Sequence, residues 1–194
     1  MIEEKNGKMV LLAGNNKLKI EYMANAVEHG FNVLADKPLV IDYQGFIELE
    51  KVYRTAARKQ LLIYDIMTER YDVLHQLQKL MMADSVLFGK LVAGTPGEPA
   101  VSVTSIHTFY KEVAGKPLIR PASYYDVSRQ GEGIVDVTTH LIDLAMWKCF
   151  PDQPIDYRTD IEVIAASRYP TIITPGEFAL STGEEEFPDY LAPY

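Results

Sequence analysis

The first third of the chain alternates short apolar runs with amphipathic stretches. The apolar runs cover residues 9–14, 31–35 and 61–67, and each ends at turn-forming or charged residues, as strands do. Between them, residues 18–30 and 43–60 repeat apolar side chains at helical spacing. Strands that alternate with helices pair in parallel through right-handed crossovers. We therefore expect a parallel sheet with ligands bound beyond the carboxyl ends of its strands.

The rest of the chain has a different pattern. Residues 71–91 predict a helix, and residues 100–113 and 160–174 alternate with β-branched and aromatic side chains, which indicates strands. Residues 131–147 predict a further helix, and Thr174-Pro175 can begin a short last one. We expect the fold class to be α/β plus α+β, with one domain over residues 1–68 and another over residues 69–194.

A polar stripe interrupts the apolar helix predicted over residues 131–147. Asp136, His140 and Asp143 follow one another at intervals of four and three, so they share one helical face. The simpler interpretation is that this face meets solvent. However, the stripe contains no Lys, Arg or Glu, the usual solvated helix residues. Gly131 and Gly133 precede the helix and would let the backbone approach another group closely, so a ligand-facing stripe remains the second interpretation.

The second predicted strand ends at Asp36-Lys37-Pro38. A strand that ends in charge and proline is usually meeting solvent. Yet proline holds the preceding residue in an extended conformation. Lys37 would therefore stand at the mouth of the sheet, where its ammonium can donate to a ligand oxygen.

These motifs occur together, in order, in a known family. Asn16, the helix to Gly30, NVLADKPL and GEGIVDVTTHLIDL resemble the family of glucose–fructose oxidoreductase and inositol dehydrogenase. The last part of the chain is similar to the branch described as putative oxidoreductases. The resemblance implies a Rossmann-like parallel sheet, here partial, followed by part of an open β-sheet domain with helices. It also implies hydride transfer between a sugar or cyclitol hydroxyl and NAD or NADP.

The resemblance also implies residue roles. Lys37 matches the motif lysine, and Asp136 and His140 match the catalytic aspartate and histidine. His140 would act as general base on the substrate hydroxyl, Lys37 would bind its oxygen, and Asp136 would orient the substrate or the imidazole. The predicted cofactor-binding residues are Gly14, Asn15, Asn16, Asp36 and Pro38. The predicted substrate-binding residues are Asp143 on the stripe and Arg120 and Tyr124, which lie in a long loop that could equally be an ordinary surface loop.

The departures from the family pattern limit what the chain can do alone. Asp36 replaces the usual Glu, Gly14-Asn15 stand where Thr-Pro is common, and G-x-G-x-x-G is missing. Pyrophosphate binding needs those glycines and a helix N-terminus. We expect a middle portion of a family member that binds no NAD or NADP by itself and is inactive alone. The alternative is a non-catalytic carbohydrate-binding or assembly domain.

Composition excludes other classes of protein. The net charge of −8 and the absence of a basic cluster argue against a nucleic-acid partner. One cysteine and four histidines without metal-ligand spacing predict neither a disulfide nor a metal site. No apolar run suits a membrane span and the N-terminus does not resemble a signal peptide, so a cytoplasmic location is the default if no segment precedes Met1. Exposed sheet edges predict a homo-oligomer, which light scattering would test.

Overall fold

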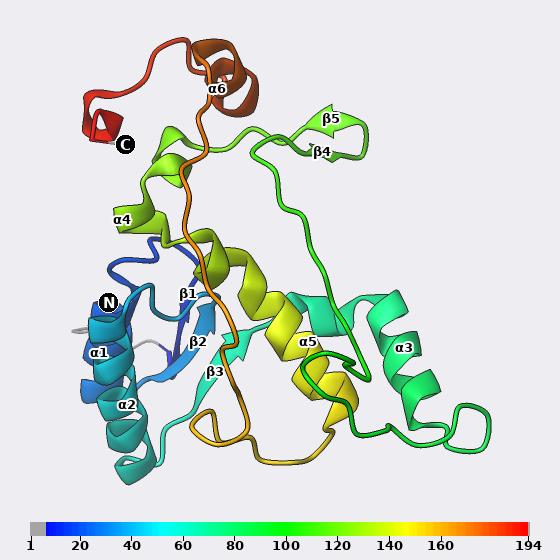
Figure 1. Cartoon of the computed structure of the whole chain (residues 1–194). Helices are drawn as coiled ribbons and strands as arrows, with labels where there is room; N and C mark the ends of the chain where they lie inside the picture. The colour runs from blue at the N-terminus through cyan, green and yellow to red at the C-terminus, as the bar shows by residue number, and fades with distance from the viewer. Residues whose placement is uncertain (1–6, 194) are drawn as a thin grey trace. The chain divides into compact units, whose positions relative to one another are not determined.

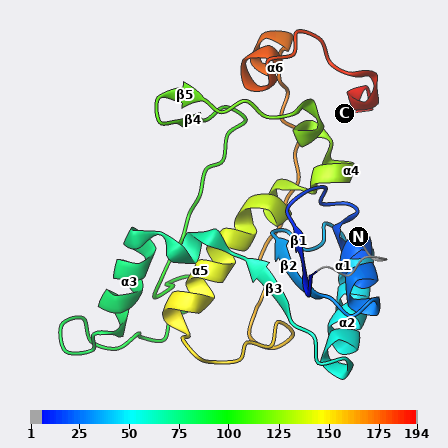
Figure 2. The same ribbon diagram turned by 180° about the vertical axis from the view of Figure 1, so that it is seen from behind.

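The computed structural model describes residues 7–193, and Figures 1 and 2 show its elements from opposite sides. Its residues group into two compact units. Unit 1 comprises Met1–Met67, Thr108–Thr139 and Thr174–Tyr194, and unit 2 comprises Thr68–His107 and His140–Ile173. Domains over residues 1–68 and 69–194 stay a prediction, because proximity alone does not show which segments fold independently.

Unit 1 contains the predicted parallel sheet. Its strands are β1 (Met9–Leu12), β2 (Asn32–Asp36) and β3 (Ile63–Ile66), hydrogen-bonded in that order and all parallel. Helices α1 (Lys19–Glu28) and α2 (Tyr43–Arg58) form the crossovers. The strand–helix alternation predicted from the sequence is therefore confirmed.

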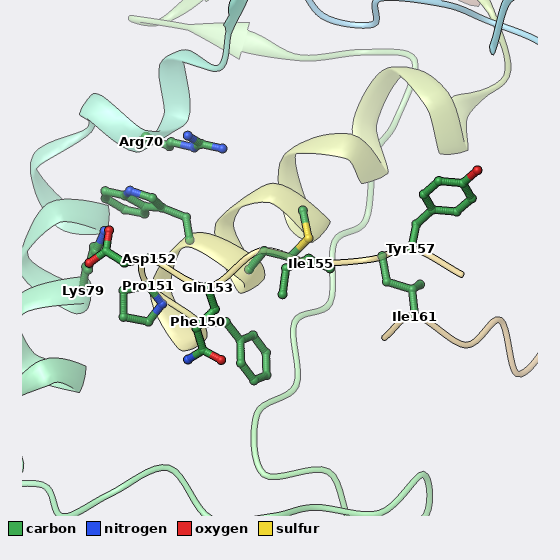
Figure 3. A pocket seen from close by; sticks show the side chains of 11 residues that line it. Arg70, Lys79, Phe150, Pro151, Asp152, Gln153, Ile155, Tyr157 and Ile161 are labelled. Atoms are coloured by element: carbon green, nitrogen blue, oxygen red, sulfur yellow. The ribbon is translucent and has the colours of Figure 1, made fainter. Parts of the chain in front are cut away.

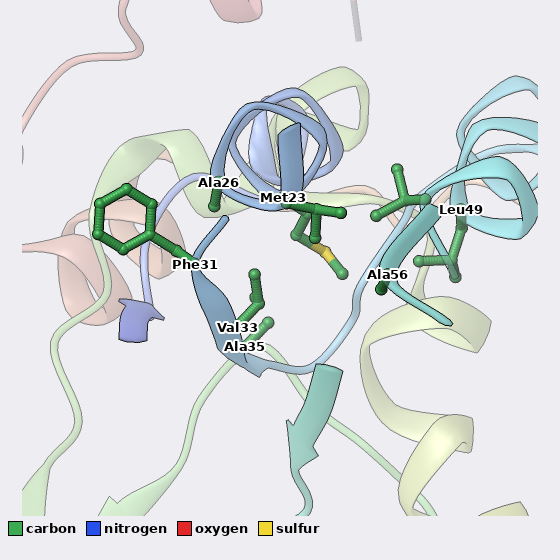
Figure 4. Packing of buried hydrophobic residues seen from close by; sticks show 9 residues of the cluster. Met23, Ala26, Phe31, Val33, Ala35, Leu49 and Ala56 are labelled. Atoms are coloured by element: carbon green, nitrogen blue, oxygen red, sulfur yellow. The ribbon is translucent and has the colours of Figure 1, made fainter. Parts of the chain in front are cut away.

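The core of unit 1 lies between one face of this sheet and the two helices (Figure 4). Val33 and Ala35, two residues apart on β2, point to the same side and are buried. Met23 of α1 and Leu49 of α2 pack against them at helical positions that the sequence marks as apolar. Asp42 starts α2, because its Oδ1 accepts a hydrogen bond of 2.7 Å from the Gly45 N–H.

Short elements complete unit 1. They are β4 (Glu112–Val113) and β5 (Lys116–Pro117), which form an antiparallel hairpin, then η2 (Ala122–Tyr125), α4 (Val127–Gln130), the π-helical segment η3 (Ile134–Thr138), α6 (Pro175–Thr182) and η4 (Asp189–Leu191). Phe178 of α6 is fully buried, with ring centroids 5.5 Å from Tyr125 and 4.4 Å from Phe187. Thr174 and Glu177 form a reciprocal capping box at the start of α6, where the sequence predicts a helix.

Unit 2 is built on η1 (Thr68–Tyr71), α3 (Val73–Ala83) and α5 (Thr139–Cys149), whose first residue belongs to unit 1. Polar and cation–π contacts join α3 to α5. The Lys148 ammonium lies 2.8 Å from His75 Nδ1 and 2.6 Å from Gln78 Oε1. The Lys79 ammonium lies 4.2 Å from the centre of the Trp147 ring.

Two expected strands are wrong. Residues 100–111 and 160–173 contain no regular strand, and the only strand found within residues 100–113 is the two-residue β4. An alternating pattern becomes a strand only where another strand pairs with it, and no described segment pairs with residues 100–111 or 160–173. Side chains such as Val103, Ile106 and Ile172 therefore stay exposed. The predicted helix over residues 71–91 is also shorter, since α3 ends at Ala83.

Candidate active site

The structure brings together two of the predicted catalytic residues. Lys37 follows β2 at its carboxyl end, in a cis peptide bond with Pro38. Its ammonium donates to Asp136 Oδ1 at 2.8 Å and to the Asp136 backbone carbonyl at 2.7 Å. The two side chains are 22% and 13% exposed, so solvent screens this ion pair only in part. The pair joins the sheet edge to a segment 99 residues later in the chain.

The backbone before Asp136 makes a close approach that requires glycine. Gly131 has φ of +91°, and a Cβ at this position would lie 2.9 Å from Ile41 Cγ2. Asp136 itself lies in the π-helical segment η3, which runs directly into α5. Because a π turn is wider than an α turn, it shifts the face that Asp136 presents relative to the rest of the helix. Regular helical spacing therefore could not predict the orientation of Asp136.

A buried lysine that the sequence interpretation missed binds the backbone at the same carboxyl end of β2. Lys19, in the first turn of α1, is only 1% exposed. Its ammonium donates to Asn16 Oδ1 at 3.0 Å and to the carbonyls of Asp36 and Pro38 at 2.8 and 2.9 Å. Burial lowers the pKa of Lys19, which the nearby Asp36 carboxylate partly opposes. A charged residue at a buried position of an apolar helix face is the signal that could have identified it.

The polar stripe does not simply face solvent. Asp143 is buried and forms a two-bond ion pair with Arg70 of unit 2, in which Arg70 Nε lies 2.7 Å from Asp143 Oδ2. His140 Nδ1 is buried and has no hydrogen-bond partner among the described residues. Asp136 is paired with Lys37. Asp136 and Asp143 therefore form ion pairs within the protein, and one ring nitrogen of His140 is buried. The substrate-binding role of Asp143 stays a prediction, because its carboxylate is already paired with Arg70.

The predicted substrate residues Arg120 and Tyr124 lie together in unit 1. The Arg120 guanidinium lies 4.1 Å from the centre of the Tyr124 ring, and the backbone N–H of Arg120 donates to the Ser181 carbonyl. Arg120 Nε is buried without a partner among the described residues. Burial raises the pKa of Tyr124, Arg120 opposes this, and Asp136 adds to it. The Tyr124 hydroxyl therefore stays protonated and lies within the electrostatic range of Asp136.

Three of the predicted cofactor-binding side chains form hydrogen bonds with backbone groups of the chain. Asn15 Oδ1 accepts from the Leu18 N–H, Asp36 Oδ1 accepts from the Lys37 N–H, and Asn16 Nδ2 donates to the Gln130 carbonyl. At Gly14 an added Cβ would meet no protein atom within 4 Å, so no neighbouring residue requires glycine at this position. The acidic Glu21 lies in the first turn of α1 and would repel a phosphate. That the chain binds no NAD or NADP by itself therefore stays a prediction, which rests on the missing G-x-G-x-x-G.

The structure also shows whether cavities, metal sites and membrane-spanning helices occur among residues 7–193. A cavity of about 430 Å³ lies in unit 2, where Met146, Trp147 and Phe150 line it together with Arg70 and Lys79 (Figure 3). It contains none of Lys37, Asp136 and His140. In residues 7–193 no three His, Cys, Asp or Glu side chains gather as metal ligands would. None of the helices in that range has the length and hydropathy of a membrane crossing.

Comparison with known proteins places the chain in a family. Residues 77–194 match the family model described as "Putative oxidoreductase C terminal domain". The match covers more than half of the chain, which therefore belongs to this family. The match confirms the resemblance to the branch described as putative oxidoreductases. No curated protein matches the chain.

Several solved structures are similar. A putative oxidoreductase from Parabacteroides merdae is 48% identical with a TM-score of 0.90, over 100% of this chain and 44% of that chain. Myo-inositol 2-dehydrogenase from Lactobacillus plantarum is 20% identical with a TM-score of 0.50, over 76% and 39%. The WlbA dehydrogenase from Thermus thermophilus, in complex with NAD and UDP-GlcNAcA, is 17% identical with a TM-score of 0.51, over 75% and 43%. The chain thus spans less than half of each of these proteins, and the last two matches show the fold alone.

Proposed function

We propose that this chain supplies the proton-handling side of the active site of an NAD(P)-dependent oxidoreductase that acts on a sugar or cyclitol hydroxyl. One observation carries the proposal: the Lys37–Asp136 ion pair at the carboxyl end of β2, with Nζ and Oδ1 2.8 Å apart. Ligands of open α/β sheets bind at this end of the strands. A half-buried ion pair formed there by residues 99 positions apart favours a built site over a strand that merely meets solvent.

Lys37 is suited to bind the oxygen of a substrate. An ammonium has three N–H donors, and two of them are given to the oxygens of Asp136. The third can donate to a substrate hydroxyl, and the positive charge stabilises the oxygen as its proton leaves. Asp136 fixes the direction of the Lys37 side chain, so that this donor does not need to be ordered when the substrate binds.

His140 is the candidate that accepts the proton. It follows Asp136 by four residues, and its buried Nδ1 lacks a partner among the described residues. A buried nitrogen without a hydrogen bond costs about 1–3 kcal/mol, which favours a site that a ligand or another group completes. Imidazole exchanges protons near neutral pH, as a general base must.

The cofactor and substrate class rest on the family. Myo-inositol 2-dehydrogenase and WlbA support a nicotinamide cofactor and a cyclitol or sugar substrate. Because the sequence lacks G-x-G-x-x-G, we assign this chain substrate binding and proton transfer and derive no step through the nicotinamide.

The test uses the full-length protein with a panel of sugars and cyclitols and either NAD or NADP, with nicotinamide reduction followed by absorbance. At least one member should be oxidised, and Lys37→Met and His140→Ala should each lower kcat by about 100-fold or more. Glu48→Gln, at an exposed pair on α2, is the control and should leave kcat unchanged. Turnover that survives Lys37→Met or His140→Ala would remove the assigned role. Sugar binding without turnover of any panel member would favour the non-catalytic alternative.

A further inference from the structure

Lys19 is the most buried charged side chain in the described part of the chain, with 1% exposure. Burying a lysine ammonium is costly unless every donor finds an acceptor. Lys19 meets this condition, since its three hydrogen bonds of 2.8–3.0 Å match its three N–H donors. An apolar residue would fill the same space without the cost of burying a charge. The charge instead provides three hydrogen bonds that an apolar side chain could not make, which points to a role beyond packing.

The acceptors of Lys19 surround one residue. Two are the carbonyls of Asp36 and Pro38, which flank Lys37 on either side. Lys19 thus holds the backbone on both sides of Lys37, where β2 ends at Asp36 and strand pairing stops fixing the chain. The position of this backbone decides where the Lys37 ammonium can reach.

The third acceptor connects Lys19 to the other half of the ion pair. Asn16 Oδ1 accepts from Lys19, while Asn16 Nδ2 donates to the Gln130 carbonyl at 2.9 Å. Gln130 is followed by Gly131, which packs closely against Ile41 at the start of the segment that carries Asp136. One chain of hydrogen bonds therefore runs from Lys19 to the backbone on both sides of the Lys37–Asp136 pair.

We propose that Lys19 is a positioning residue of the Lys37–Asp136 site: it fixes the segment around Lys37 and, through Asn16, the segment that leads to Asp136. The proposal rests on the function proposed above only for its kinetic consequence. Its structural consequence, an ordered Lys37 ammonium, can be measured without a substrate. A neutral Lys19 amine would have two donors for three acceptors, so the positioning requires the protonated form.

The first experiment measures the order of Lys37 directly. The full-length protein is acylated with trace acetic anhydride, and the labelling of Lys37 relative to exposed Lys90 is quantified by mass spectrometry. Lys19→Met should raise this ratio several-fold, because Lys37 spends less time paired with Asp136. Met23→Ala is the matched control: Met23 lies one turn further along α1 and is fully buried, but belongs to the core. A ratio that rises equally in both variants, or in neither, overturns the proposal.

The second experiment separates this proposal from the proposed function. Lys19→Met should lower kcat by about 10- to 100-fold with a smaller change in KM, since a displaced donor impairs the reacting geometry more than binding. Met23→Ala should leave kcat within about twofold of wild type despite its loss of stability. Turnover retained in Lys37→Met contradicts the proposed function. Turnover lost in Lys37→Met but retained in Lys19→Met contradicts only the positioning role.

A second variant covers the case in which Lys19→Met does not fold. Asn16→Ala keeps the buried ammonium but removes one acceptor and the link to Gln130. Lys37 labelling should then rise and kcat should fall in the same direction as for Lys19→Met. An Asn16→Ala protein with wild-type labelling and kcat would refute the hydrogen-bonded chain from Lys19 to Gln130.

Discussion

The Arg70–Asp143 ion pair allows a structural role to be separated from a substrate-binding role. The Asp143 side chain is 8% exposed and that of Arg70 is 37% exposed. Breaking a fully buried pair costs about 3–5 kcal/mol, whereas an exposed pair contributes about 0–1 kcal/mol. Because the guanidinium left by Asp143→Asn can turn partly to water, we expect Asp143→Asn to lower the free energy of unfolding by about 1–3 kcal/mol.

A double-mutant cycle measures this pair. Urea unfolding of wild type, Asp143→Asn, Arg70→Met and the double variant should give a coupling energy of about 1–2 kcal/mol. Glu48→Gln, which breaks the exposed Lys51–Glu48 pair, is the control and should change stability by less than about 0.5 kcal/mol. A coupling energy near zero, together with a KM raised by Asp143→Asn, would refute the structural assignment and support substrate binding by Asp143.

Two further predictions concern stability. Met23→Ala should lower the free energy of unfolding by about 2–5 kcal/mol in urea, because Met23 is fully buried in the core of unit 1; a loss below about 1 kcal/mol would contradict that packing. Hydrogen bonds from the Thr174 backbone and hydroxyl lower the pKa of Glu177, so its capping contribution is complete above the unfolded-state pKa and is lost as pH falls through the lower folded pKa. Stability between about pH 5 and pH 3 should therefore fall less steeply in Glu177→Gln than in wild type, and identical slopes would exclude the contribution.

Local patterns predicted the first part of the fold because its strands and helices are short-range features. The apolar runs of β1 to β3 and the spacing of Met23 and Leu49 are sufficient to place the sheet and its two helices. Residues 100–113 and 160–174 carry equally clear strand patterns but form almost no strand. Alternation specifies the conformation of a strand only when a partner strand is present.

The candidate site was predictable in part. The Asp36-Lys37-Pro38 motif and Asp136 were identified from residue order, and the structure places Lys37 against Asp136. Lys19 was missed, because two of its three acceptors are the backbone carbonyls of Asp36 and Pro38, which have no sequence signature. The partner of Asp143 was missed for a related reason: Arg70 is 73 residues away, and nothing in the spacing indicates that the two meet.

The separation of Lys37 and Asp136 by 99 residues also has a consequence for folding. Closing a long loop costs conformational entropy before the contact can stabilise it, so long-range contacts form slowly. The strands and helices of residues 9–66 can assemble from neighbouring segments, but this ion pair needs the chain to return from beyond residue 130. During synthesis Lys37 can therefore pair with Asp136 only after the chain has been made beyond residue 136. A polypeptide cut between the two residues would yield two pieces, each with one member of the pair.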